Sequence, residues 1–218
     1  MTTTVRRFPQ LVVGLVLFGA GLGLVVRGGN GQGPWTVFHE GLADHSPLSI
    51  GTATIVTGVL LLVATLGLRV PIGLGTVGNV ALIGPATDLT IWLVDTPGSA
   101  VGRATMTALG PVVTAIGSGL YLGVHLGPGP RDGLMTGLHQ RGLSIRRARF
   151  LIEAVAFTAG VALGGTAGWG TVWWLLVIGP GVQWMLPRFD RGPRLRPGRR
   201  STARARFGPF EGVPWKYR

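Results

Sequence analysis

Long apolar runs alternate with short polar segments along most of the chain. Six of these runs approach the roughly 20 residues that a helix needs to cross the hydrocarbon core of a bilayer. They cover residues 8–26, 49–68, 73–94, 104–126, 150–166 and 170–186. The fifth run is the weakest, because it contains Glu153 and is shortened by Gly164-Gly165. The pattern predicts an all-α integral membrane protein with six transmembrane helices.

The composition also favours the membrane class. Of 218 residues, 46% are hydrophobic and only 13% are charged, whereas soluble domains carry about 25% charged residues. Glycine occurs 38 times. Small residues four positions apart predict close helix crossings at Gly19 with Gly23 and at Gly119 with Gly123. The chain has no cysteine, which excludes disulfides and thiolate metal sites.

Basic residues are concentrated on one side of the predicted membrane domain. If the N-terminus is cytoplasmic, the outer loops hold only Arg27 and Arg103, each at the end of a span. The inner segments before the C-terminal tail hold Arg6, Arg7, Arg69, Arg131, Arg141, Arg146 and Arg147. The positive-inside rule therefore places both termini in the cytoplasm. A cleavable signal peptide is disfavoured, because the first apolar run is long and no small-x-small cleavage site follows it.

Residues 188–218 differ from the membrane domain at 1–187, because they supply +8 of the net charge of +12. Glycine and proline interrupt this segment, and it lacks an apolar stripe, so we expect a disordered cytoplasmic tail. A polybasic segment beside a membrane is attracted to anionic lipids. Nucleic acid is a weaker candidate partner, since no folded reading surface accompanies the charge.

The chain contains an internal repeat. The frame of Gly33-Pro34-Trp35-Thr36-Val37-Phe38-His39-Glu40-Gly41-Leu42 returns 96 positions later. The second copy is Gly129-Pro130-Arg131-Asp132-Gly133-Leu134-Met135-Thr136-Gly137-Leu138. Repeat one covers about residues 8–94 and repeat two about 104–187, each with three predicted spans. An odd number of spans forces the second copy to enter from the opposite face, so the repeats are predicted to be inverted, as in many secondary transporters.

Each Gly-Pro stretch is predicted to be a short half-helix. Residues 35–42 would cover only about 12 Å as a helix at 1.5 Å per residue, too short to cross. Pro34 and Pro130 suit the first helical position, because the missing N–H would have no partner there. Two placements remain open: a re-entrant loop buried in protein or lining a wet cavity, and an amphipathic turn at the interface.

These motifs resemble a known family. The first Gly-Pro stretch, Gly127-Pro128-Gly129-Pro130-Arg131-Asp132-Gly133, and Gly170-Thr171-Val172 with Ile178-Gly179-Pro180 are similar to the YczE/YyaS/YitT family of bacterial integral membrane proteins, in its YczE-like branch. The resemblance runs to about residue 186 and excludes the basic tail. It implies a protein of the bacterial inner membrane and adds little about chemistry.

The two half-helices supply the candidate solute-binding residues. A half-helix N-terminus concentrates positive dipole, and beside it the Arg131 guanidinium would form an anion cradle. The alternative is that Arg131 is one more cytoplasmic anchor and Asp132 a helix cap or its ion-pair partner. The candidate set is Gly33, Pro34, Trp35, His39, Glu40, Gly129, Pro130, Arg131 and Asp132.

The cluster His39, Glu40, Asp44 and His45 has three possible interpretations: a metal site, a proton-coupled gate, or ordinary polar loop residues. Its spacing is not a recognised ligand pattern, because His39 and Glu40 are neighbours that point apart on a helix. Proton-coupled gating by either of these two residues remains open. We predict no metal site and no cofactor.

Charged residues within spans are costly and therefore candidates for function. Asp88 has no basic residue one helical turn away, and the repeat matches it to Gln183, so both side chains are expected to face one central cavity. Pro85 and Pro180 are matched candidate kinks for gating. Glu153 has a simpler explanation, since it could pair with Arg149 one turn earlier.

The sequence therefore favours a small-solute transporter, with an anionic substrate suggested by Arg131 and a site between the two Gly-Pro loops. The alternative is a non-transporting accessory protein that assembles with another membrane protein. The sequence also leaves open whether the chain forms a homo-oligomer. An enzyme is disfavoured and no catalytic residue is assigned, because no nucleophile, base and orienting group occur at plausible spacing.

Overall fold

The computed structural model describes residues 2–191, which form eight α-helices and no strand. The helices are α1 (Thr2–Gly28), α2 (Pro34–Asp44), α3 (Ile50–Gly67), α4 (Leu74–Leu93), α5 (Ala100–Leu122), α6 (Pro130–His139), α7 (Ile145–Ala162) and α8 (Trp169–Phe189). The all-α prediction is confirmed. The predicted tail lies, from residue 192 onward, outside the described residues.

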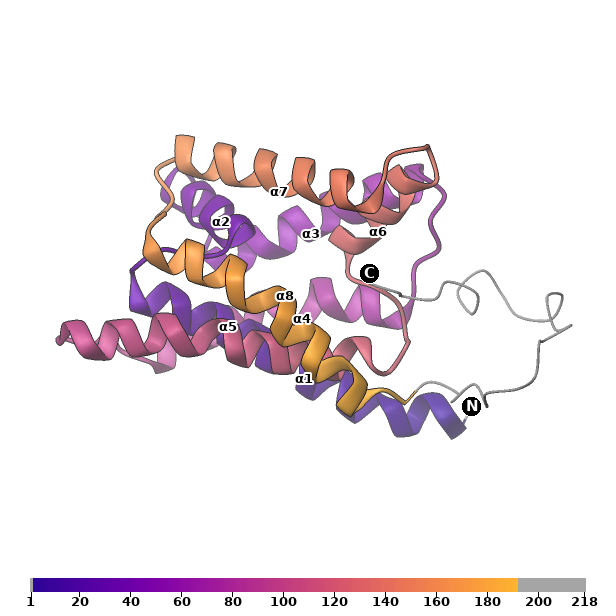
Figure 1. Cartoon of the computed structure of the whole chain (residues 1–218), viewed down its shortest axis with the longest axis horizontal. Coiled ribbons are helices and arrows are strands. Elements are labelled where there is room, and N and C mark those ends of the chain that lie inside the picture. The colour runs from indigo at the N-terminus through magenta and orange to yellow at the C-terminus, as the bar shows by residue number, and fades with distance from the viewer. Residues whose placement is uncertain (1, 192–218) are drawn as a thin grey trace, which may run out of the picture.

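The eight helices form two layers (Figure 1). One layer contains α4, α1, α5 and α8 in that order, and the other contains α2, α3, α6 and α7. The two short helices, α2 and α6, lie toward opposite ends of the molecule. The two layers are in contact where α3 of the second layer packs along α4 of the first.

Glycines allow the helices of the first layer to cross closely. A Cβ added at Gly19 would lie 2.5 Å from the Ile83 carbonyl oxygen on α4, and one added at Gly119 would lie 2.7 Å from Met185 Cβ on α8. The predicted close crossings are therefore confirmed, and they join α1 to α4 and α5 to α8. A second contact of the same kind joins α1 to α5, where a Cβ at Gly21 would lie 2.6 Å from the Gly110 carbonyl oxygen.

The loops before α2 and α6 are held by the starts of α8 and α4. The Gly170 N–H donates to the Asn30 carbonyl at 2.8 Å, and the Gly75 N–H donates to the Leu126 carbonyl at 2.7 Å. This second contact explains why α5 ends at Leu122, four residues before the predicted boundary. His125 adopts φ +56°, so the chain leaves the helix and Leu126 lies against α4.

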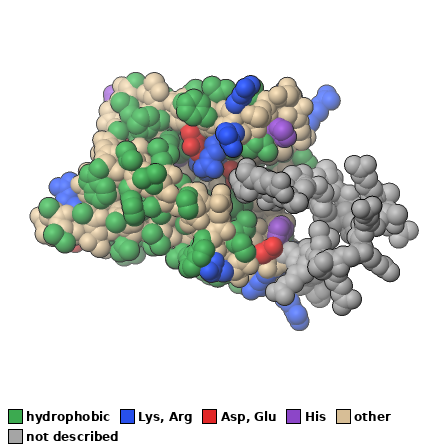
Figure 2. Space-filling view, viewed as in Figure 1, with side chains coloured by type: hydrophobic (Ala, Val, Ile, Leu, Met, Phe, Trp, Pro, Cys, Tyr) green, Lys and Arg blue, Asp and Glu red, His purple; other side chains and the backbone are tan. Residues whose placement is uncertain are grey.

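Many hydrophobic side chains are exposed on the face shown in Figure 2, as is expected of a surface in contact with lipid. On α3 the exposed side chains include Leu60 (65% exposed) and Val63 (61%). Three helices are long and apolar enough to cross a bilayer: Arg6–Gly28 within α1, Ile50–Gly67, and Ala100–Leu122. The structure thus supports membrane association, with three candidate spans among residues 2–191.

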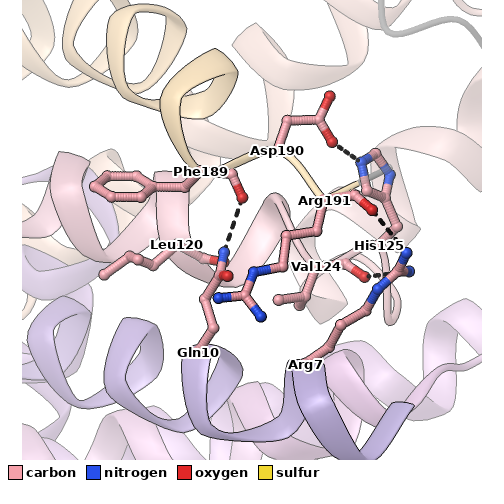
Figure 3. Close-up of polar contacts among 8 residues, drawn as sticks. All are labelled: Arg7, Gln10, Leu120, Val124, His125, Phe189, Asp190 and Arg191. Carbon is pink, nitrogen blue, oxygen red and sulfur yellow. Dashed lines mark hydrogen bonds and ion pairs between the residues drawn. The ribbon is translucent and has the colours of Figure 1, made fainter. Parts of the chain in front are cut away.

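Residues near the two ends of the described chain contact one another (Figure 3). Arg7 donates to the Arg191 carbonyl at 2.7 Å and to the Val124 carbonyl at 3.3 Å. Gln10 donates to the Phe189 carbonyl at 2.9 Å. These bonds tie the start of α1 to the end of α8 and to the residues that follow α5.

Candidate functional site

A cavity of about 280 Å³ lies between the two layers. The N-termini of both half-helices border it. The contributing residues are Gly33, Pro34, Trp35 and Thr36 from α2, and Gly129, Pro130, Arg131 and Asp132 from α6. Apolar side chains of α1 and α8, including Leu22 and Ile178, line much of the rest.

Both half-helices begin in the same way. Their N-cap glycines, Gly33 and Gly129, have φ near −65° and ψ near 160°, followed by proline at the first helical position. The first backbone bonds run from Val37 N to Gly33 O (3.0 Å) and from Gly133 N to Gly129 O (2.9 Å). The N–H groups before them have no intrahelical acceptor, and the helix dipole adds partial positive charge at both ends.

The α2 side of the site has unused hydrogen-bonding capacity. Gln32 is fully buried, and both atoms of its amide lack a partner among the described residues. Trp35 Nε1 and His39 Nε2 are also buried without a partner, while His39 Nδ1 lies 3.0 Å from Thr54 Oγ1. Burial lowers the pKa of His39 to about 4, so the imidazole is neutral near pH 7.

The α6 side is charged. Arg149 Nε lies 3.1 Å from Glu153 Oε1, and Arg131 Nη1 lies 3.8 Å from the same oxygen. Tyr121 donates to Asp132 Oδ2 at 3.4 Å. The predicted pairing of Glu153 with Arg149 is therefore confirmed, and Arg131 joins it. Figure 2 shows basic and acidic side chains meeting near the middle of the viewed face.

Two candidate residues have other roles. Glu40 accepts hydrogen bonds from Thr166 N (2.5 Å) and Thr166 Oγ1 (3.1 Å) and fixes the loop before α8 instead of lining the cavity. Asp88 likewise lies off the cavity, with its carboxylate bonded to Ser49 and to the Gly51 N–H at the start of α3. The expectation that Asp88 faces the central cavity is wrong, because α3 supplies partners from a distant part of the sequence.

The other candidates divide between the cavity and its surroundings. His39 and Gln183 line it. Pro85 and Pro180 lie on exposed faces of α4 and α8, outside the lining. His45 bonds the Gly41 carbonyl through Nδ1 at 3.0 Å. Within residues 2–191, no group of three or more His, Asp or Glu side chains could hold a metal ion.

Several cavity residues were missed from the sequence. Thr54, Tyr121 and Ser118 line the cavity, are ordinary polar residues in apolar surroundings, and are distinguished by no short motif. Gln32, which precedes the lining residue Gly33, was missed as well, although it does not itself line the cavity. A signal was available for Gln32, which stands between two glycines of the loop. A buried amide next to Gly31 and Gly33 has few side-chain partners nearby.

Residues 2–191 form eight helices with many exposed hydrophobic side chains and a mainly apolar cavity bordered by polar and charged groups, which defines an all-α integral membrane protein with a candidate site between two short helices. The chain belongs to the family of unknown function DUF6198, whose profile matches residues 5–187.

The chain is 35% identical over 195 residues to an uncharacterized protein of Haemophilus influenzae, covering 89% of each chain. It is 29% identical over 187 residues to the uncharacterized membrane protein YczE of Bacillus subtilis, covering 84% of this chain and 87% of that one. The resemblance to the YczE-like branch is thus confirmed. No solved structure matches the chain.

Proposed function

We propose that the chain is a carrier that moves a small solute with an anionic group across the bacterial inner membrane. In this proposal it has six spans, α1, α3, α4, α5, α7 and α8, with both termini cytoplasmic. The helices α2 and α6 enter from opposite faces as re-entrant half-helices. The solute binds between their N-termini.

Paired contacts at matching positions support the inverted repeat. The bond from Gly75 to Leu126 corresponds to the bond from Gly170 to Asn30, with offsets of 95 and 96 positions between equivalent residues. In each case the loop before one repeat's half-helix is held by the last span of the other repeat. A two-fold relation between the repeats predicts this arrangement, because the rotation that superimposes one repeat on the other also superimposes one of these two contacts on the other.

The helix caps show the same correspondence. Ser49 accepts from Thr52 N at the start of α3, and Ser144 accepts from Arg147 N at the start of α7. The loop glycine two residues before each N-cap has positive φ, +107° at Gly31 and +120° at Gly127. In Figure 1, α1 and α5 run in opposite directions, as inversion requires.

The observation that carries the function is the single cavity bordered by both half-helix N-termini. Two positive dipole ends, the unpartnered Trp35 Nε1 donor and the Arg131 guanidinium offer more donors than the described residues satisfy. A carboxylate, sulfonate or phosphate group would satisfy them. The apolar walls suit a small organic body, and the volume limits its size.

The proposal is tested by uptake into proteoliposomes from a panel of acetate, succinate, glutamate, sulfate and inorganic phosphate, together with thermal-shift measurements of the same solutes. We expect at least one anion to be transported and to stabilise the protein. Arg131→Ala should reduce uptake at least about tenfold, the cost of one charge-assisted bond. Arg147→Ala removes an exposed arginine outside the cavity and should leave uptake unchanged.

Equal uptake by Arg131→Ala and the parent protein would refute the assigned site. Absence of transport and of stabilisation with every solute, together with co-purification of a stoichiometric membrane partner, would favour the accessory-protein alternative. Binding of anionic lipids by the basic tail remains a separate prediction, tested by deleting residues 192–218 and measuring binding to anionic vesicles.

A further inference from the structure

Two interfaces at matching positions of the repeats are packed differently. A Cβ added at Gly84 on α4 would lie 2.4 Å from the Gly51 carbonyl oxygen on α3. Gly179 on α8 is the counterpart of Gly84, 95 positions later. A Cβ added there would meet no atom within 4 Å. The α3–α4 interface is closed, whereas α7 and α8 diverge from their connecting loop (Figure 1).

A carboxylate fastens the closed interface. Asp88 Oδ2 accepts from Ser49 Oγ at 2.5 Å, and Asp88 Oδ1 accepts from the Gly51 N–H at 2.7 Å. Asp88 therefore supplies an acceptor and a negative charge at the N-terminus of α3, where both are stabilising. The start of α3 and the end of α4 lie away from the side of the molecule where the N-terminus lies (Figure 1).

The open interface lacks this fastening. The counterpart of Asp88 is Gln183, which is exposed, lines the cavity and makes no hydrogen bond to α7 within residues 2–191. The counterparts of Ser49 and Gly51 are Ser144 and Arg146 at the start of α7. This end of the cavity is also the charged end, where Arg149 and Glu153 form their ion pair.

The layer of α4, α1, α5 and α8 is held together by polar contacts at both of its ends. At the terminal end, Arg7 and Arg191 tie α1 to α8, and His125 Nε2 lies 2.6 Å from Asp190 Oδ1 (Figure 3). At the other end, Arg27 Nε on α1 donates to the Ile91 carbonyl on α4 at 2.8 Å. Motion that closes α7 onto α8 must therefore come from the other layer, which contains α2, α3, α6 and α7.

We propose that α3–α4 and α7–α8 are the two gates of the cavity, and that Asp88 is the latch that keeps the α3–α4 gate closed in the described state. Tilting the layer of α2, α3, α6 and α7 releases this latch, opens α3 from α4 and closes α7 onto α8. The inference rests on the proposed carrier function and adds which interface controls access to each face.

The test moves the latch from one gate to the other. The double variant Asp88→Gln/Gln183→Asp removes the carboxylate from α4 and places one on α8, where Ser144 Oγ and the Arg146 N–H become its donors. Because the chain has no cysteine, spin labels can be introduced at matched exposed positions on the helices of each gate. The label pairs are Val56→Cys with Leu89→Cys across α3–α4, and Leu151→Cys with Trp184→Cys across α7–α8.

Distances are measured by double electron–electron resonance in lipid nanodiscs without solute. In the parent protein we expect one dominant distance at each gate. In the double variant the α3–α4 distance should lengthen and the α7–α8 distance should shorten. The ratio of the two states should change at least about tenfold, because the hydrogen bonds involve a charged acceptor.

A single substitution that perturbs the latch less than the double variant serves as a second test in case the double variant misfolds. Ser49→Ala removes one of the two donors and should shift both distances in the same directions by a smaller fraction. Asp95→Gln changes an exposed carboxylate beyond the end of α4 and should shift neither. Unchanged distances in the latch variants, or lengthening at both gates together, would overturn the proposal, because either result makes Asp88 only a helix cap.

This outcome is separable from that of the transport assay. If the double variant lengthens the α3–α4 distance and shortens the α7–α8 distance, but no solute is taken up by the parent protein, the gates are supported and the carrier is refuted. Uptake that persists while the distances stay fixed would support the carrier and refute the gates.

Discussion

The loop before α6 offers a direct test of how the cavity is held in place. Gly127 has φ +120°, and a Cβ added there would lie 2.8 Å from Gly73 Cα. Gly142 also has a positive φ, +97°, but no atom lies within 4 Å of its added Cβ. Alanine at either position imposes backbone strain of about 1–3 kcal/mol. Only Gly127→Ala adds overpacking, which typically costs about 1–3 kcal/mol.

We therefore expect Gly127→Ala to lower the free energy of unfolding by about 2–6 kcal/mol and Gly142→Ala by about 1–3 kcal/mol. At roughly 2–4 °C per kcal/mol for a chain of this size, the contact alone should separate the two melting temperatures by about 2–12 °C. Thermal unfolding followed by tryptophan fluorescence in one detergent measures this difference. Equal losses would refute the view that packing against the start of α4 holds the loop.

The proposed repeat extends this prediction to the other loop. Gly31 has φ +107°, and a Cβ added there would lie 2.4 Å from Gly168 N. Gly31→Ala should therefore destabilise the protein by about as much as Gly127→Ala. A loss no larger than that of Gly142→Ala would show that only one of the two loops is held by packing.

Five further substitutions, at four residues, test the polar contacts around the site. Glu40→Ala leaves Thr166 N without its acceptor and should cost about 1–3 kcal/mol in thermal unfolding, whereas Glu40→Gln keeps an acceptor and should cost less; equal costs would contradict this role. Ser144→Ala removes a helix cap worth about 1 kcal/mol, and Ser49→Ala should cost more because Ser49 also bonds a carboxylate on α4. Burial keeps His39 neutral, so His39→Gln should leave the pH dependence of solute binding unchanged between about pH 6 and 8. A changed pH profile in a binding titration would instead indicate that His39 takes part in proton coupling.

The sequence predicted the features that depend on local chemistry. Apolar runs predicted the long helices, and Gly-Pro pairs predicted the starts of α2 and α6, because proline and glycine act on their own backbone. The end of α5 was missed, since the pairing of Leu126 with Gly75 joins residues far apart in the chain. Periodicity contains no information about such a contact.

The same distinction explains the outcome at the site. Arg149 lies four residues before Glu153, so their pairing was foreseen from helical spacing. Glu40 accepts hydrogen bonds from Thr166, which is 126 residues away in the chain. Asp88 accepts a hydrogen bond from Ser49, which is 39 residues away. A carboxylate without a local partner is predicted from the sequence to face the cavity, but the tertiary fold supplies partners that a single sequence does not reveal.

Under the proposed two-fold relation, some equivalent positions of the two half-helices keep the same residue and others differ. Positions that shape the backbone keep the same residue, as Gly33 and Gly129 do at the N-caps. Two residues after these N-caps, where the side chains also line the cavity, the chemistry differs, because neutral Trp35 is replaced by Arg131. A site that held a symmetric ion would need no such difference, because both half-helices would meet the same charge. This difference at the lining suits a solute with one anionic end and one apolar end, with the arginine side receiving the anion.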